Sequence, residues 1–181
     1  IDRLEEETAE LIHQKELQDA RAEAEQKLEK LLLQQTEKLG EIQDDINLRM
    51  ETINGVVTDK QETAPLLYIT PQKDIIFETP GNTSEGTAFK SLVVYDLSVL
   101  ELRPIPAIIH DSNILKRIED VHLEHILERY QSTKHQVFIA FDKADSTTEK
   151  AHRILEETAI LRLSDGNELF GRSWSKYETN D

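Results

Sequence analysis

The sequence predicts an α/β protein, in which a long helix precedes a lobe built on a parallel sheet flanked by helices. Residues 1–53 contain no Pro and a single Gly, Gly40, and are rich in Glu, Gln, Lys, Leu and Ala, which is typical of one long helix. Residues 105–109 and 136–141 are short apolar runs between helical patterns, and polar residues follow each run, as they follow the buried strands of a parallel sheet. We therefore expect a coiled-coil arm followed by an α/β lobe.

The arm, residues 1–53, carries apolar side chains at heptad-like spacing. These fall into three runs that do not share one register, which predicts a coiled coil with stutters. The runs are Ile1, Leu4, Thr8 and Leu11; Leu17, Ala24, Leu28 and Leu31; and Leu39, Ile42, Ile46, Met50 and Ile53. A helix of this length would reach roughly 80 Å and could not bury its apolar stripe on a small domain alone. We therefore expect a second helix beside it.

The turn pair Asn54-Gly55 marks the expected boundary between the arm and a globular lobe, residues 54–181. The elements expected in the lobe are a hairpin (66–70 and 74–78, across Pro71-Gln72-Lys73), a helix from Ser84 or Gly86 to Leu102, a strand (105–109), a helix (113–131), a strand (136–141), a helix (147–157) and a closing hairpin (159–163 and 168–171, across Asp165-Gly166). Ligands bind at the carboxyl ends of parallel strands, so the loops His110-Asp111-Ser112 and Asp142-Lys143 are candidate sites.

The composition excludes several classes of function. Lys and Arg number 21 against 36 Asp and Glu, a formal net charge of −15, so a basic nucleic-acid-binding module is not expected. The absence of Cys excludes a disulfide framework and Cys-based zinc or iron–sulfur sites. No apolar stretch approaches the roughly 20 residues of a membrane span, so no membrane partner is expected. Because the chain begins at Ile1 without a signal peptide, we expect a piece of a longer, cytoplasmic protein.

The segment Asn82-Thr83-Ser84-Glu85-Gly86-Thr87 opens the first helix of the lobe. A Ser hydroxyl, a Gly that permits close backbone approach and the free N–H groups of a helix start together indicate an anion site. The alternative is that Ser84 is an ordinary N-cap.

Asp111 follows a buried strand, where a carboxylate can orient the waters of a Mg²⁺ ion held by a nucleotide phosphate. The alternative is that it caps the next helix through Asn113 or Ile114. His110 is a candidate base or metal ligand, with a hydrogen bond inside the fold as the alternative.

Other signals are thin. His122 and His125 are three residues apart on a predicted helix, and a solvated face is favoured over a shared metal because no HExxH-type arrangement accompanies them. No GxSxG motif surrounds Ser112, so a nucleophilic triad is not expected. The sequence also has no GxxxxGK[ST] motif, so it carries no phosphate-cradling loop of its own.

Taken in order, these pieces resemble the C-terminal half of an SMC-, RecF- or RecN-type ABC ATPase. In that family the head is split in sequence into an N-terminal lobe with the P-loop and a C-terminal lobe, separated by an antiparallel coiled-coil hairpin. Residues 1–53 resemble the returning arm, 83–87 lie where the family has its LSGGE signature, 105–111 resemble the Walker B strand and 136–141 the strand before the switch loop. The His-Asp-Ser ending resembles a bacterial SMC-like branch with an uncharacterised C-terminal domain, associated with DNA maintenance or anti-phage defence.

The resemblance implies where ATP and Mg²⁺ would bind. Ser84, Gly86 and Thr87 would contact the γ-phosphate of ATP bound to the opposite head, and Asp111 would position Mg²⁺. Glu85 replaces the first glycine of the signature and brings a negative charge close to that phosphate.

The resemblance also implies which groups would act in hydrolysis. Ser112 stands where the family has its catalytic glutamate, and Asp142 stands where it has a switch histidine. Because a Ser is not a comparable general base, His110 and Asp142 are the nearest groups to orient the attacking water.

The implied function is that of an ATPase completed by its own N-terminal P-loop lobe and antiparallel arm. Two such heads would sandwich ATP and form a homodimer, and DNA would be contacted by the complete assembly. An alternative is a non-catalytic coiled-coil module that dimerises and binds a protein partner. A third reading, a metal-dependent hydrolase centred on His110 and Asp111, lacks enough ligands in the sequence.

Overall fold

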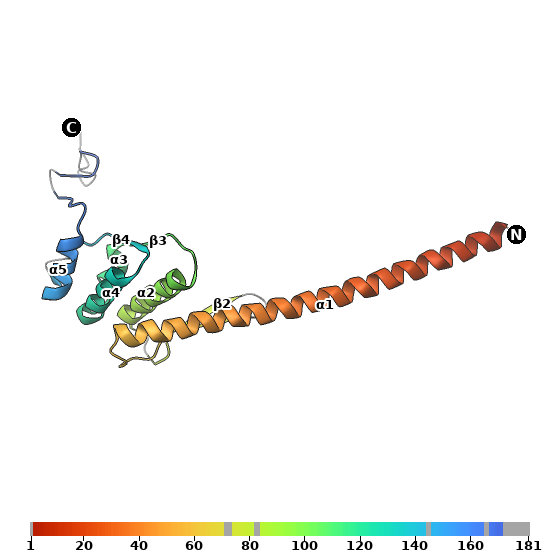
Figure 1. The fold of residues 1–181 in the computed structure, drawn as a ribbon, viewed down its shortest axis with the longest axis horizontal. Helices are drawn as coiled ribbons and strands as arrows, with labels where there is room; N and C mark the ends of the chain where they lie inside the picture. Colours follow the sequence, from red (N-terminus) through yellow and green to blue (C-terminus); the bar gives the residue numbers. More distant parts are fainter. Residues whose placement is uncertain (1, 71–73, 82–83, 144–145, 165–166, 172–181) are drawn as a thin grey trace, which may run out of the picture.

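The computed structural model describes residues 2–70, 74–81, 84–143, 146–164 and 167–171, with the side chains of the first helix described from Glu10 onward. Helix α1 (Asp2–Val57) is one unbroken helix of 56 residues that projects away from a small α/β lobe (Figure 1). Within the described residues, no helix has a stretch that is both long and apolar enough to cross a lipid bilayer.

Helix α1 does not end at the predicted turn pair Asn54-Gly55 but continues to Val57. The Asn54 side chain is buried, and its Nδ2 donates to the Glu62 carbonyl at 2.9 Å, so this residue fastens the returning chain to the helix. The turn comes later, at Asp59 and Lys60, which have φ values of 50° and 61°. Asn and Gly are common turn residues, but here the hydrogen bond from the buried Asn54 side-chain amide holds this residue in helical backbone.

The two ends of α1 have different surroundings. The proximal arm, residues 39–57, contributes Ile46, Met50, Ile53 and Val57 to the core of the lobe. The distal arm, residues 10–38, has no such cover in the described structure, and its large apolar side chains are exposed: Leu11, Ile12, Leu17, Leu28, Leu31, Leu32 and Leu33. The third predicted apolar run is thus buried by the lobe itself, whereas the expectation of a partner helix applies to the distal arm.

The predicted hairpin is confirmed. Strands β1 (Leu66–Ile69) and β2 (Ile75–Glu78) pair antiparallel, and the predicted turn at 71–73 lies outside the described residues. The outer edge of β1 is covered by α1, because the Asn47 amide exchanges two hydrogen bonds with the Leu67 backbone (2.8 and 2.9 Å) and Gln43 accepts from Ile69 N (2.8 Å). Four residues of helix and two of strand both span about 6 Å, which lets the two amides match the strand.

The remaining elements form an α/β unit. Helix α2 (Glu85–Leu102) is followed by strand β3 (Ala107–His110), helices α3 (Ser112–Leu115) and α4 (Asp120–Ser132), strand β4 (Gln136–Ile139) and helix α5 (Glu149–Thr158). β3 and β4 pair in parallel, with Ala107 opposite Gln136 and His110 opposite Ile139. The core includes Val93, Leu97, Leu100, Leu115, Leu123, Ile126, Leu127 and Ala151. The α/β class is therefore confirmed.

Two predicted elements differ from the structure. The helix expected over 113–131 is broken between α3 and α4, where Ile118 turns into the core and its N–H bonds Leu115 O at 3.2 Å. In the expected closing hairpin, the described residues form a single bridge between Ser164 and Asn167, and the Asp165-Gly166 turn lies outside the described residues. Residues 159–163 are not in a strand, and their backbone has no ladder partner among the residues that the structure describes.

Candidate functional site

The parallel pairing brings the two predicted loops together at the carboxyl ends of β3 and β4. The Ser112 hydroxyl donates to Asp142 Oδ1 and accepts from Asp142 N at 3.3 Å, and Lys116 Nζ lies 3.6 Å from Asp142 Oδ2. The Ser112 bond, assisted by the Lys116 charge, lowers the pKa of the Asp142 carboxyl below its ordinary value. The strand ends therefore present an anchored, ionised carboxylate to solvent.

Asp111 lies at the same edge and caps α3. Its Oδ1 accepts from Asn113 N at 2.6 Å, so the predicted alternative of a capping role is confirmed. The residue is exposed, and its carboxylate retains lone pairs that this bond does not use. A single exposed carboxylate suits Mg²⁺, which is commonly held by one or two carboxylates together with substrate phosphates.

His110 is oriented differently from its neighbours. Its side chain is 2% exposed and turns into the core, where Nδ1 lies 2.6 Å from the Tyr130 hydroxyl and Nε2 lies 2.9 Å from Asp96 Oδ2. Both ring nitrogens are thus hydrogen-bonded within the fold, which was the alternative to a role as base or metal ligand. Asp142, in contrast, faces solvent.

The start of α2 gives each signature-like residue a contact within the lobe. Ser84 is the N-cap: its Oγ accepts from Thr87 N at 3.2 Å and donates to Thr87 Oγ1 at 2.9 Å. A Cβ on Gly86 would lie 2.8 Å from Arg117 O, so a glycine is required for this close packing. Glu85 forms an ion pair with Arg117. Asn82 and Thr83, which belong to the predicted anion site, lie outside the described residues.

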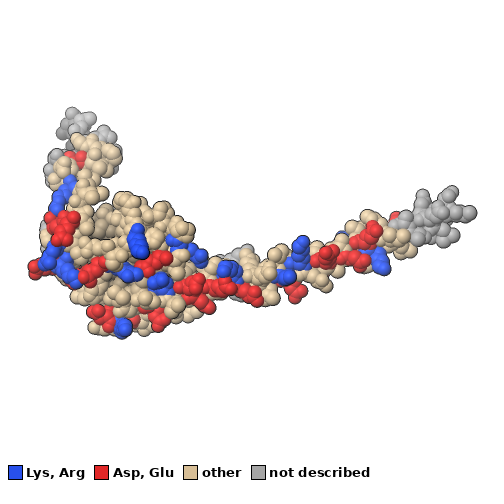
Figure 2. Space-filling view, viewed as in Figure 1, with Lys and Arg blue, Asp and Glu red and all other residues tan. Residues whose placement is uncertain are grey.

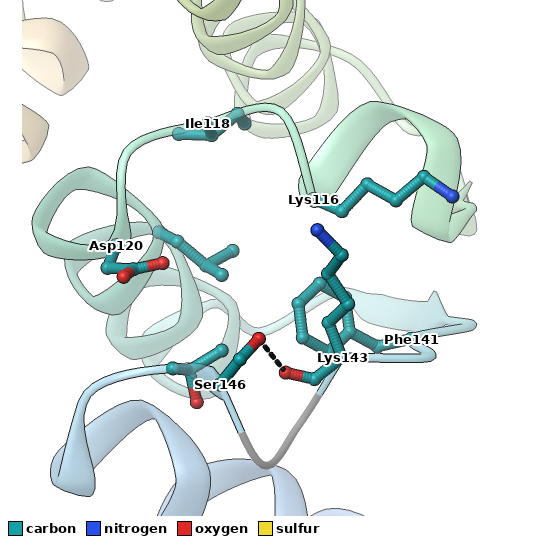
Figure 3. A pocket seen from close by; sticks show the side chains of 8 residues that line it. Lys116, Ile118, Asp120, Phe141, Lys143 and Ser146 are labelled. Carbon is teal, nitrogen blue, oxygen red and sulfur yellow. Dashed lines mark hydrogen bonds between the residues drawn. The ribbon is translucent and has the colours of Figure 1, made fainter.

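A cavity of about 230 Å³ lies beside the strand ends (Figure 3). Its walls come from the α3–α4 link and the segment before α5: Lys116, Ile118, Asp120, Leu123, Phe141, Lys143, Ser146 and Thr147. Figure 3 shows the Ser146 hydroxyl bonded to the Lys143 carbonyl, a distance of 3.1 Å. Its charged lining consists of Lys116, Lys143 and Asp120, and Lys116 is already paired with Asp142 at 3.6 Å. We assign this cavity no ligand.

A larger groove of about 890 Å³ runs along β4 and continues to residues 159–163. Among the described residues β4 pairs only with β3, so its second edge is free. Apolar side chains near this edge are exposed: Phe138 by 40%, Ile160 by 91%, Leu161 by 58% and Leu163 by 57%. An apolar surface of this kind beside an unpaired strand edge is typical of a surface that another element covers.

Sequence reasoning missed two buried residues, Lys90 and Tyr130, and the partly exposed carboxylates Asp96 and Glu62 that take part in buried hydrogen bonds. Asp96 and Tyr130 hold His110, and Lys90, which is 1% exposed, pairs with Glu62 at 2.5 Å. Lys90 and Asp96 interrupt the apolar pattern of α2, and a charge within such a pattern is the signal that could have indicated buried pairs.

The two histidines of α4 are also accounted for within the lobe. His125 Nδ1 bonds Val57 O at 2.9 Å, and His122 Nε2 lies 3.6 Å from Glu62 Oε1. Over the described part of the chain, no three His, Cys, Asp or Glu residues lie together as a metal-binding group. The described residues therefore offer no independent support for a metal-dependent hydrolase at His110 and Asp111.

Comparison with known proteins gives a family and distant structural likenesses. A solved structure described as "Structural biochemistry of ATP-driven dimerization and DNA stimulated activation of SMC ATPases" is similar to this chain at 13% identity and a TM-score of 0.45, covering 62% of this chain and 73% of the other. No curated protein matches significantly. The family model described as "Uncharacterised protein conserved in bacteria (DUF2326)" matches residues 42–174, which is well over half of the chain. The chain therefore belongs to this bacterial family.

Proposed function

We propose that this chain is the C-terminal half of an SMC-like ATPase head, comprising the returning arm and the C-terminal lobe. The observation that carries the proposal is the β3–β4 pair, two parallel strands whose polar carboxyl ends meet and whose outer edge on β4 has no strand partner among the described residues. Purely parallel sheets are normally larger and are covered on both faces. A strand from a P-loop lobe, paired along β4 and seated against the apolar groove, would complete the sheet.

In the completed head, the residues at the strand ends would serve the nucleotide. The P-loop lobe would hold the ATP phosphates, and Asp111 would bind Mg²⁺ from the exposed edge of the sheet. Mg²⁺, when bound, would neutralise charge on the phosphates. Ser84, Gly86 and Thr87 would face the ATP of the opposite head, where the start of α2 offers N–H groups and a favourable helix dipole.

Hydrolysis in such a head is expected to be slow. Ser112 is hydrogen-bonded to Asp142 and is a poor base. The Asp142 carboxylate, which accepts the Ser112 bond, is therefore the group beside Ser112 that could orient a water. A base works best when its pKa lies near the working pH, and the pKa of Asp142 is lowered rather than raised. ATP-driven association of two heads, followed by slow release, is therefore the behaviour we propose.

The distal arm and the charge distribution bear on the two remaining partners, an antiparallel helix and DNA. Exposed leucines along residues 10–38 require an antiparallel helix, which we assign to the outgoing arm of the same protein. Figure 2 shows acidic and basic side chains interspersed along the arm without a broad basic surface on this face. With a net charge of −15, DNA contact is assigned to the complete assembly rather than to this chain.

One observation favours a second candidate function, a non-catalytic dimerisation and protein-binding module. Gly86 and Glu85, which the resemblance places at the nucleotide, already have structural reasons in Arg117, one as a close backbone contact and the other as an ion pair. In this reading the start of α2 is only a helix start and the free edge of β4 binds a protein partner.

ATP turnover by the full-length parent protein distinguishes the two functions. Asp111→Ala and Ser84→Arg should each abolish turnover, the first by removing the Mg²⁺ ligand and the second by placing bulk at the facing head. Asp74 is an exposed carboxylate on the hairpin, so Asp74→Ala is the matched control and should leave ATP turnover unchanged. A parent that neither binds nor hydrolyses ATP would refute the ATPase and leave the scaffold.

A further inference from the structure

Three elements of the lobe meet at one buried imidazole. Asp96 comes from the middle of α2, His110 is the last residue of β3, and Tyr130 comes from α4. Tyr130 is 9% exposed, and its ring centroid lies 5.7 Å from that of His110. With Nδ1–Oη at 2.6 Å and Nε2–Oδ2 at 2.9 Å, these three residues form a hydrogen-bonded chain, which we name the His110 clamp.

The donors and acceptors of the clamp can be assigned from its chemistry. A carboxylate only accepts, so Nε2 carries a proton and donates to Asp96. Burial, together with the nearby charge of Asp96, raises the pKa of Tyr130 far above its usual value, so its hydroxyl keeps its proton. That hydroxyl can then donate to Nδ1, so that both ring nitrogens of His110 and the Tyr130 hydroxyl have a hydrogen-bond partner.

The His110 clamp holds the residue that immediately precedes Asp111 in the strand-end site. His110 O accepts from Ala140 N at 3.0 Å, and the next residue is Asp111, whose own carbonyl accepts from the amides of Ile114 and Leu115. The side chain of His110 is thus held by α2 and α4, and its carbonyl is held by Ala140, the residue that follows β4.

We propose that Asp96, His110 and Tyr130 are positioning residues that fix the Asp111-Ser112 backbone and thereby set the Asp111 carboxylate for Mg²⁺. His110 acts through the backbone rather than as a base, because it has no free ring nitrogen. The part that concerns Mg²⁺ rests on the proposed ATPase function, whereas the fixing of the backbone does not. The clamp also connects Asp111 to α2, whose N-cap is Ser84. Ser84 and Asp96 are roughly 18 Å apart along this helix.

The test removes one hydroxyl and compares it with an identical change nearby. In the 181-residue chain, Tyr130→Phe should speed hydrogen exchange at the Ile114 and Leu115 amides on the order of tenfold, because Nδ1 is left unpaired in the core. Tyr95→Phe, a partly buried tyrosine that stacks edge-on against Phe77, is the control and should leave these amides unchanged. Asp96→Asn keeps an acceptor for Nε2 and should give a smaller acceleration than Tyr130→Phe.

A second readout uses the full-length parent. At saturating ATP, Tyr130→Phe should raise several-fold the Mg²⁺ concentration for half-maximal turnover and leave the KM for ATP nearly unchanged. Equal exchange in Tyr130→Phe and Tyr95→Phe would overturn the backbone role of the clamp. An unchanged Mg²⁺ requirement in an active parent would overturn its role in setting the Asp111 carboxylate for Mg²⁺. If Tyr130→Phe fails to fold, Asp96→Asn decides the exchange comparison. Faster exchange in a parent without ATPase activity would support the backbone role and refute the ATPase instead.

Discussion

Gly86→Ala tests whether the start of α2 is held by packing alone. The new Cβ would lie 2.8 Å from Arg117 O, so the two segments must separate by roughly 0.6 Å or more to reach ordinary contact. The Arg117 segment is poorly placed to yield, because its side chain is paired with Glu85 and lies over the Phe89 ring at 5.3 Å. Overpacking of this kind costs about 1–3 kcal/mol, and the better helix propensity of Ala returns up to about 1 kcal/mol.

The net expectation for Gly86→Ala is a loss of about 1 kcal/mol in the free energy of unfolding of the 181-residue chain, measured by urea titration without nucleotide. Gly40→Ala is the matched control, since nothing lies within 4 Å of the added Cβ in the middle of α1. That variant should be neutral or more stable by up to about 1 kcal/mol. If Gly86→Ala proves as stable as Gly40→Ala, the packing explanation for this glycine is refuted.

Three further predictions concern the buried pair, the strand-end carboxylate and the arm. Lys90→Met should destabilise the lobe by about 2 kcal/mol in urea titration, because it removes the lysine partner of the Glu62 charge, and adding Glu62→Leu should restore part of the loss. Ser112→Ala should raise the pKa of Asp142 toward its ordinary value in a carboxyl NMR titration; the Ser112 bond stabilises the fold above about pH 4, so variant and wild type should converge in acid. The chain should associate through its arm at micromolar concentration, and Leu28→Glu should shift the light-scattering mass toward the monomer.

Much of the fold follows from sequence because local pattern and tertiary contact agree there. The apolar runs of β3 and β4 pair in parallel as expected. The hairpin of β1 and β2 also forms as its spacing predicts, with Thr70 N donating to Asp74 O beside the turn. Disagreement occurs where a long-range contact decides the backbone. Asn54 stays helical because its side-chain amide donates a hydrogen bond to Glu62 O. The helix predicted over 113–131 is interrupted before α4 because Ile118 turns into the core there.

The candidate site was predictable in part, for a related reason. The loops that carry Asp111 and Asp142 follow from the rule that parallel strands end at one edge of a sheet, and Ser112 indeed bonds Asp142 there. The direction of the His110 side chain depended on Asp96 and Tyr130, which lie 14 and 20 residues away in sequence. Strand alternation gives a side chain one of two faces, but only the partners on α2 and α4 determine which face is the buried one.

The strand-end and helix-start groups share a property that bears on function: each already has a partner in the lobe. Asp111 bonds Asn113, Asp142 bonds Ser112, and Ser84 bonds Thr87. A ligand that displaces one of these partners gives up a hydrogen bond worth about 0.5–1.5 kcal/mol, and a single phosphate contact in water gains little more than that. Tight binding therefore requires several contacts made at once, which only a second lobe and a facing head could supply. On this argument the 181-residue chain alone should bind ATP weakly, and a Kd below about 1 μM measured by calorimetry for this chain would contradict the split-head proposal.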